Sequence, residues 1–354
     1  MTGKAVTFRP LDIRQASENE YRCLNEFKNT MNREYLPDDP PIPLEESIQE
    51  WKTLPEFVEL EAYTAWDPRN TKIIAFCRVL VFHTGDNEHL ARFGIEVLPE
   101  YRQQGIGRQA LAMLLPFAQK HQRSLWMVFV WDSIDAAAQF LERLGARRGS
   151  EMKMNQLKVA EFDKSLVERW LEQSKELNTE FKLGFWDAAY PDADLDDVVA
   201  LFQEVANDQP RDKLEMEDMN FTPELLRSWE KNIFACGDQR WTLYVTDRKN
   251  GKLVGLTEVF WNPNREMLLQ QAFTGIDPAY RGKGLGRWLK AEMMQKILHD
   301  RPEVQIIRTG NANSNAPMLK INHEMGFKPY IGHTIWQVET GKIEAYLLEK
   351  QRTI

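Results

Sequence analysis

The chain has 354 residues, of which 43% are hydrophobic and 28% are charged, and its formal net charge is −8 at pH 7. This composition is typical of globular proteins, and the length exceeds what one hydrophobic core usually serves. The acidic balance disfavours generic binding to nucleic acid or to an anionic membrane. Because the sequence contains neither a secretion signal nor about 20 consecutive apolar residues, we expect a cytoplasmic protein without a membrane span.

Neither the cysteines nor the histidines form a metal-binding or disulfide pattern. Cys23, Cys77 and Cys236 are far apart and have no CxxC spacing, which predicts neither disulfides nor zinc fingers. The six histidines include no HxxxH or HExxH pair, and His83 and His89 flank a predicted hairpin turn. We therefore expect no metal.

The first half of the chain predicts alternating strands and helices, from hydrophobic periodicity and β-branched clusters. In chain order the expected elements are strand 6–9, helix 18–29, a proline-rich acidic loop 32–46, strands 63–66, 73–82 and 89–98, a turn at 99–108, helix 109–120, a very apolar strand 125–131 and helix 136–144. Gly145 suits the end of that last helix, because glycine accepts the left-handed conformation common there.

The second half repeats this order. The expected elements are strand 182–186, helix 195–206, an acidic loop 207–220, a helix opened by Pro223, strands 241–246, 252–261 and 267–276, a turn at 278–287, helix 288–298, strand 304–309, helix 316–325 and closing strands near 331–338. Between the halves, Phe162, Leu166 and Trp170 recur at helical spacing and predict a connecting helix whose aromatics are core. The domains expected are 1–160 and 181–354, joined by 161–180.

The apolar strand and helix positions predict the core of each half. These are Ile73, Ile74, Val79, Val81, Leu125, Val128 and Val130 in the first half, and Leu243, Val245, Val254, Ile306, Ile307 and Leu319 in the second.

A ten-residue sequence motif occurs in both halves, 179 residues apart. Residues 99–108 read PEYRQQGIGR and residues 278–287 read PAYRGKGLGR. Each copy follows a predicted strand and opens a predicted helix. Glycines let consecutive N–H groups turn into one concavity, and a helix N-terminus adds positive potential. The motif therefore predicts a pyrophosphate-binding turn in each half and a duplicated chain.

Three kinds of glycine-rich turn fit such a site to different degrees. A Walker-A loop requires GxxxxGK[ST], which neither copy supplies. A dinucleotide fingerprint, GxGxxA, is formally present from Gly105 to Ala110, and Asp132 ends the next predicted strand. That fingerprint normally sits on the first strand of its unit, whereas several elements precede it here.

The third kind accounts for more of the sequence. Arg-x-x-Gly-x-Gly preceded by Pro-x-Tyr resembles motif A of the GNAT superfamily of acetyl-CoA-dependent N-acetyltransferases. The segment from Asn315 to Gly326-Phe327 resembles the family's motif B, and the order of elements is similar in both halves. The resemblance implies an α/β protein of two tandem GNAT-like domains, each a mixed, mostly antiparallel central sheet flanked by helices.

The resemblance also implies a reaction and a set of binding residues. Acetyl-CoA would be the acyl donor and a primary amine of a small molecule the acceptor, with no metal. The residues implied in cofactor binding are Val97, Arg102, Gln103, Gln104, Gly105, Ile106 and Gly107 in the first repeat, and Ile276, Arg281, Gly282, Lys283, Gly284, Leu285, Gly286 and Asn315 in the second.

The two repeats differ in motif B. Family members often have a tyrosine seven residues after the motif-B asparagine, as the proton donor to the thiolate. The second repeat has Asn315 but places Asn322 at the tyrosine position, and the first repeat has Ile134 and Leu141 at the two positions. We therefore expect catalysis in the C-terminal repeat, beside a degenerate N-terminal repeat. The alternative is a non-catalytic acetyl-CoA-binding module or regulatory protein.

Glu258, an acid within an apolar strand, is the expected general base, and Glu96 is the comparable acid of the first repeat. The proton for the thiolate would come from water or from Tyr330. Loop 207–220 carries five acids against two bases. Because the corresponding loop usually roofs the acceptor site in this fold, it favours a cationic amine, with no nucleic-acid or membrane partner expected. The oligomeric state is left open.

Overall fold

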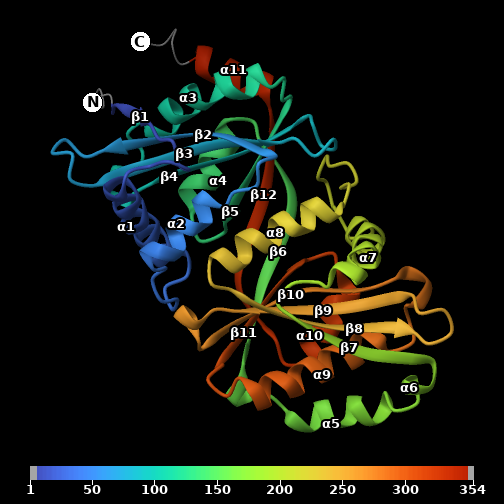
Figure 1. The fold of residues 1–354 in the computed structure, drawn as a ribbon. Helices are drawn as coiled ribbons and strands as arrows, with labels where there is room; N and C mark the ends of the chain where they lie inside the picture. Colours follow the sequence, from blue (N-terminus) through green and yellow to red (C-terminus); the bar gives the residue numbers. More distant parts are fainter. Residues whose placement is uncertain (1–5, 350–354) are drawn as a thin grey trace. The chain divides into compact units, whose positions relative to one another are not determined.

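The computed structural model describes residues 6–349, which form two compact units. Unit 1 takes its described residues from Met1–Glu151, Arg211–Asp218 and Gly332–Ile354, and unit 2 consists of Met152–Pro210 and Met219–Ile331. Each unit contains a mixed, mostly antiparallel sheet flanked by helices (Figure 1). The units differ from the sequence repeats, because unit 1 also includes a short internal segment and the end of the chain.

Unit 1 has the strand order β1-β2-β3-β4-β5-β12. Helices α3, α4 and α11 contribute to one hydrophobic cluster against the sheet, and α1 and α2 contribute to another. Figure 1 shows α3 and α11 across the sheet from α1 and α2. Its elements are β1 (Phe8–Pro10), α1 (Glu18–Tyr35), α2 (Leu44–Lys52), β2 (Val58–Trp66), β3 (Ile73–Phe82), β4 (Leu90–Val97), η1 (Pro99–Tyr101), α3 (Ile106–Lys120), β5 (Leu125–Trp131), α4 (Asp135–Arg143), part of β12 (Lys328–Glu339) and α11 (Thr340–Glu349).

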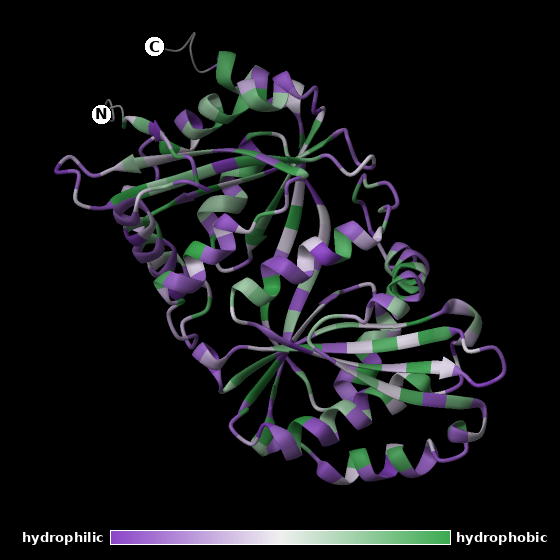
Figure 2. Ribbon diagram, viewed as in Figure 1, coloured by the Kyte–Doolittle hydropathy of each residue, from purple (hydrophilic) through white to green (hydrophobic). Residues whose placement is uncertain are grey.

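Unit 2 has the strand order β6-β11-β10-β9-β8-β7. Helices α5 and α9 pack into its hydrophobic core, and Figure 2 shows hydrophobic residues alternating with hydrophilic ones along α5. Its elements are part of β6 (Arg147–Lys158), η2 (Val159–Glu161), α5 (Lys164–Gln173), α6 (Leu177–Glu180), β7 (Phe181–Asp187), η3 (Asp192–Asp194), α7 (Leu195–Asn207), α8 (Pro223–Ala235), β8 (Gln239–Asp247), β9 (Leu253–Trp261), η4 (Pro263–Arg265), β10 (Leu268–Ile276), η5 (Pro278–Tyr280), α9 (Leu285–Asp300), β11 (Ile306–Ala312) and α10 (Ala316–Glu324).

Each sheet is completed by a strand from the other half of the sequence. Strand β6 follows α4 in the chain, but its residues Met152–Lys158 pair antiparallel with β11 in unit 2. Strand β12 follows α10, but His333–Glu339 pair antiparallel with β5 in unit 1. The chain thus exchanges the strands that come after the two motif-B helices. The sequence does not indicate this exchange, because both repeats have the same order of elements.

The parallel strand pair of each unit is short. In unit 1, β4 pairs with β5 only at Leu90–Arg92, and in unit 2, β10 pairs with β11 only at Leu268–Gln270. Beyond these positions the ladder between the two strands ends. The later residues of β4 and β10 therefore present one edge of the backbone without a neighbouring strand, immediately before each glycine-rich turn.

The predicted core is largely confirmed. Ten of the thirteen predicted residues are buried, whereas Val128, Ile306 and Leu319 are half-buried. Phe162 and Trp170 belong to the core of unit 2, as expected for the connecting helix. Val128 is half-buried because it faces a cavity in unit 1.

Candidate functional site

Both glycine-rich turns have the backbone of an anion-binding concavity. Gln103 and Gly105 have φ of 59° and 83°, and Gly282 and Gly284 have φ of 79° and 93°. Helices α3 and α9 begin directly after Gly105 and Gly284, and a glycine N-cap has no side chain to accept from the first-turn N–H groups. These N–H groups and the positive end of each helix suit a phosphate.

The arginine of each turn fastens the turn to its own unit. Arg102 donates from Nε to the Val97 carbonyl at 3.0 Å and from its two terminal nitrogens to Glu34 on α1 at 2.6 and 2.5 Å. Arg281 likewise donates to the Ile276 carbonyl at 3.1 Å and to Asp208 at 2.5 Å. The two guanidinium groups therefore hold the end of the strand against the helix, which leaves the backbone amides for an anion.

Unit 1 contains a cavity of about 650 Å³ beside its turn. Its walls come from α1, from the part of β4 beyond the parallel ladder, from β5 and α4, and from the turn. Gln103, Gly105, Ile106 and Gly107 line one end of it. The phosphate-binding turn and the open edge of β4 thus border the same space.

Glu96 lies in this cavity as one half of an ion pair. Lys28 on α1 donates to both Glu96 oxygens, at 2.8 and 2.9 Å, and the two side chains are 22% and 20% exposed. The Tyr35 hydroxyl lies 3.4 Å from the same carboxylate. Burial alone would raise the pKa of Glu96, but Lys28 and Arg78 outweigh it and hold that pKa below its usual value. Glu96 is therefore an anion at neutral pH.

Arg78 places a further cation on the cavity wall. It lies opposite Gly94 in the β3–β4 register, and its guanidinium lies 5.1 Å from the centre of the Trp51 ring. Together with Lys28 and Glu96, it gives the wall both signs of charge. Such a wall suits a ligand that itself carries both signs.

In unit 2 the position equivalent to Glu96 is surrounded by apolar side chains. Gly275 stands 179 residues after Glu96, so the carboxylate is absent at that position. A Cβ on Gly275 would lie 2.4 Å from Val205 and 2.7 Å from Phe273, and the Phe273 ring stacks on Phe202 of α7 at 4.6 Å. Strand β10 also carries a register shift between Gln271 and Thr274. Apolar side chains thus occupy the place where repeat 1 has an ionised group.

Glu258 lies in a buried polar network of unit 2. Its side chain accepts from the Tyr190 hydroxyl at 2.5 Å and from Thr242 at 3.0 Å, and the Arg240 Nε lies 3.7 Å away. Burial raises the pKa of Glu258, and Arg240 and the hydrogen bonds only partly oppose this effect. The residue is 4% exposed and does not line the unit 1 cavity.

The motif-B residues have structural partners. Asn315 caps α10 by accepting from the Met318 N–H at 3.4 Å, and it donates to Gln209 at 2.8 Å. Asn322 is fully buried and donates to Asn311 at 2.7 Å. In unit 1, Ile134 and Leu141 line the cavity.

The remaining predicted polar residues also have defined neighbours. Tyr330 lies on β12, and the Arg308 guanidinium lies 4.6 Å from the centre of the Tyr330 ring. Lys283 lies 3.6 Å from Glu180, and Gln104 donates to the Glu100 carbonyl at 3.2 Å. Beside the predicted base, the buried Gln271 of β10 donates to the Glu258 carbonyl at 2.8 Å.

The acidic loop expected to cover the second acceptor site is engaged elsewhere. Residues Arg211–Asp218 belong to unit 1, where Leu214 and Met216 join a hydrophobic cluster with Leu90. Its five carboxylates all have partners: Asp208 binds Arg281, Asp212 binds Ser150, Glu215 binds Arg147, Glu217 binds the Asn87 N–H, and Asp218 binds Arg211. Asp208, Glu215 and Asp218 are thus paired with arginines, whereas Asp212 and Glu217 accept from neutral donors and keep their negative charge.

Comparison with known proteins identifies the family. The model of the acetyltransferase (GNAT) family matches residues 24–146 and, a second time, residues 202–327. The chain belongs to the GNAT family. The two matches confirm the duplication that the repeated turn predicted, and they decide against a dinucleotide-binding unit. No curated protein sequence matches the chain.

Solved structures show that the tandem GNAT arrangement recurs. A tandem GNAT protein from the clavulanic acid biosynthesis pathway is 20% identical over 95% of this chain and 99% of its own, with a TM-score of 0.75. A GCN5-related N-acetyltransferase from Sphaerobacter thermophilus is 14% identical over 94% and 96% of the chains, with a TM-score of 0.66. At these identities the likeness concerns the fold. Within residues 6–349, no helix is both long and apolar enough to cross a membrane.

Sequence reasoning found the turns but missed the charged partners of Glu96. Lys28 lies beside the buried stripe Tyr21, Leu24, Phe27 and Met31 of α1, and that position was the available signal. A lysine next to the apolar face of a helix lies close to the sheet, where it can meet an acid on a strand. Which strand residue it meets depends on tertiary packing.

Proposed function

We propose that this GNAT protein transfers an acetyl group from acetyl-CoA to an amine, and that the reaction takes place in the cavity of unit 1. The observation that carries this proposal is the ionised Glu96 in a 650 Å³ cavity that also borders the phosphate-binding turn. The apolar contacts around Gly275 and Phe273 in unit 2 support the same choice. The sequence favoured the C-terminal repeat, because that repeat retains Asn315 whereas the first repeat has Ile134 and Leu141 at the motif-B positions.

The chain's own groups suggest how acetyl-CoA would lie. The amides of residues 103–107 would bind the pyrophosphate, and the open backbone edge of β4 would pair with the pantetheine arm. This path brings the thioester towards Glu96, near the end of β4. The acceptor nitrogen then attacks the thioester carbonyl, a C–N bond forms, the C–S bond breaks, and the thiolate leaves and takes up a proton.

Glu96 would position the amine rather than act as a strong base. Because its pKa is lowered, it remains an anion that attracts an ammonium group, and water would accept the proton released from the amine. Lys28 keeps Glu96 ionised and oriented until the acceptor arrives. Arg78 would meet an anionic group of the acceptor, which favours a zwitterionic amine over a polycation.

A panel of acceptors tests this proposal. The wild-type protein is incubated with acetyl-CoA and with amino acids, amino sugars or polyamines, and release of free CoA thiol is followed. We expect turnover with zwitterionic amines and at least a tenfold loss of kcat/KM in Glu96→Gln. The matched control is Glu258→Gln, which we expect to retain activity. Turnover that depends on Glu258 and not on Glu96 would place the reaction in unit 2, and acetyl-CoA binding without any turnover would favour the non-catalytic module.

A further inference from the structure

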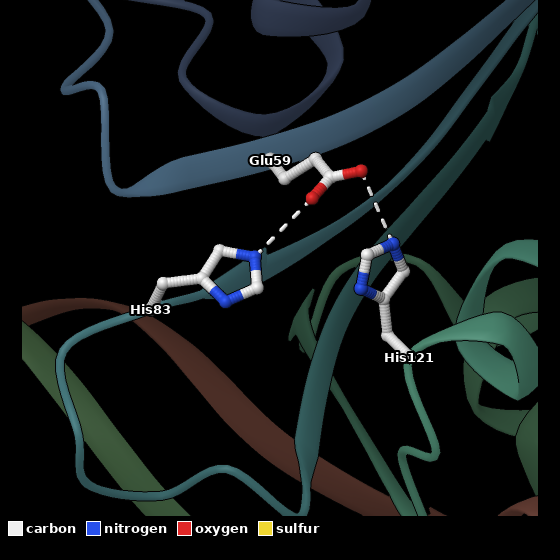
Figure 3. A group of neighbouring side chains, drawn as sticks. All are labelled: Glu59, His83 and His121. Carbon is white, nitrogen blue, oxygen red and sulfur yellow. Dashed lines mark hydrogen bonds and ion pairs between the residues drawn. The ribbon is translucent and has the colours of Figure 1, made fainter.

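Three side chains from separate elements of unit 1 converge on one point at the surface. Glu59 lies on β2, His83 directly follows β3, and His121 is the C-cap residue of α3 (Figure 3). The His83 Nε2 lies 3.3 Å from one Glu59 oxygen, and the His121 Nε2 lies 3.1 Å from the other. None of the three residues lines the cavity beside the turn, so the cluster is separate from the proposed acyl-transfer site.

The geometry suits a transition-metal ion. One ligand atom from each of the three residues lies within 4.8 Å of the other two. Around a tetrahedral Zn²⁺ with bonds of about 2.0–2.1 Å, ligand atoms stand roughly 3.3 Å apart. Small rotations of Glu59 and His83, which are 44% and 45% exposed, would close the remaining difference. Two imidazoles and one carboxylate are a donor set that Zn²⁺ accepts, with water in the fourth position.

The backbone and the ring contacts hold the two histidines in place. The His83 N–H donates to the Phe57 carbonyl at 2.9 Å, which fastens the end of β3 beside the start of β2. The His121 side chain is 13% exposed, and its ring packs against Phe117 at 4.5 Å. The buried His121 Nε2 has its ion pair with Glu59 at 3.1 Å and no hydrogen bond. A metal ion between this nitrogen and the carboxylate would supply the coordination partner that both groups lack.

We propose that Glu59, His83 and His121 form a Zn²⁺ site that joins β2 and β3 to the end of α3. Helix α3 begins at the phosphate-binding turn, so the ion would fasten the helix that carries that turn. The competing cation is Lys120, whose Nζ lies 3.5 Å from Glu59. Its side chain is 69% exposed, so it can move into solvent when the metal binds.

Calorimetric titration of the full chain with Zn²⁺ alone, after dialysis against a chelator, tests the site. We expect one ion bound per chain, and at least tenfold weaker binding in His83→Ala and in His121→Gln. His299→Ala is the matched control, because His299 lies on α9 of unit 2 with an 86% exposed side chain, and its affinity should equal that of the wild type. Lys120→Gln should bind at least as tightly as the wild type, because the competing ammonium is gone.

A second measurement distinguishes loss of the metal site from misfolding of a variant. Zn²⁺ should raise the melting temperature of the wild type and of His299→Ala, but not that of His83→Ala, because only a ligand bound to the native state stabilises it. The affinity should also fall as the pH is lowered, because an imidazole must be unprotonated to bind a metal ion. Absence of saturable binding, or equal affinity in the wild type and both histidine variants, would overturn the proposal and leave Glu59 as the centre of an ion-pair cluster.

Discussion

Gly94→Phe should block the cavity of unit 1 without unfolding the unit. Gly94 lies on β4 and lines the cavity, and its φ is outside the left-handed region. A Cβ built there meets nothing closer than Arg78 at 3.9 Å, an ordinary contact. Phenylalanine also has a higher β-strand propensity than glycine, and the whole propensity scale spans about 1 kcal/mol. The free energy of unfolding should therefore change by no more than about 1 kcal/mol.

The effect on activity should be much larger. The new ring would stand on the wall between Arg78 and Glu96, in the space where an acceptor would lie. We expect kcat/KM to fall at least 100-fold, which corresponds to about 2.7 kcal/mol of transition-state stabilisation. Gly94→Ala is the matched control, since its methyl group adds only the Cβ that already fits, and it should retain activity within a few fold.

The assay is release of CoA thiol with the best acceptor, measured beside denaturant unfolding of the same preparations. A Gly94→Phe protein that unfolds like the wild type and retains full activity would refute the placement of the reaction in this cavity. Equal losses in Gly94→Ala and Gly94→Phe would indicate that the strand itself, rather than the space beside it, is what the substitution disturbs.

Three further predictions concern other parts of the molecule. Burial lowers the pKa of Lys290 from 10.5 to about 7, so the unfolded state binds more protons between those values and stability should rise with pH across that window. Lys290→Met should abolish this pH dependence and raise the free energy of unfolding below pH 7 by at most about 5 kcal/mol. Denaturant unfolding at several pH values measures both effects. Glu34→Gln breaks the bidentate pair with Arg102. It should weaken acetyl-CoA binding by about tenfold, as measured by calorimetry, and lower the free energy of unfolding by about 1–3 kcal/mol. Unchanged affinity would show that the turn is held without the pair. A truncated chain of residues 1–160 should aggregate, because β5 would lose its partner strand β12, and a soluble, folded fragment in gel filtration would contradict this.

Much of the fold was predictable because its signals are local. Strands β3 and β5 have the predicted bounds 73–82 and 125–131, since continuous apolar runs mark them at both ends. The turns were found because glycine and helix initiation are encoded within ten residues. Helix α11 and most of β6 were missed, because their polar residues blur the period of the apolar ones.

The site was less predictable because it depends on contacts between distant residues. Glu96 and Glu258 look alike in sequence, as single acids in apolar strands. Their environments differ through Lys28, 68 residues from Glu96, and through Tyr190, also 68 residues from Glu258. The exchange of β6 and β12 was likewise invisible, since either strand satisfies the same apolar pattern in either sheet.

The most direct test of the central claim compares the two turns by one matched substitution in each. Gly105 and Gly284 have φ of 83° and 93°, and a Cβ on either meets nothing closer than 4.0 Å, so valine strains both turns alike. Acetyl-CoA turnover is measured for Gly105→Val and Gly284→Val beside the wild type. We expect Gly105→Val to abolish turnover and Gly284→Val to retain it. Loss of turnover in Gly284→Val, with activity preserved in Gly105→Val, would contradict this expectation and assign catalysis to the C-terminal repeat.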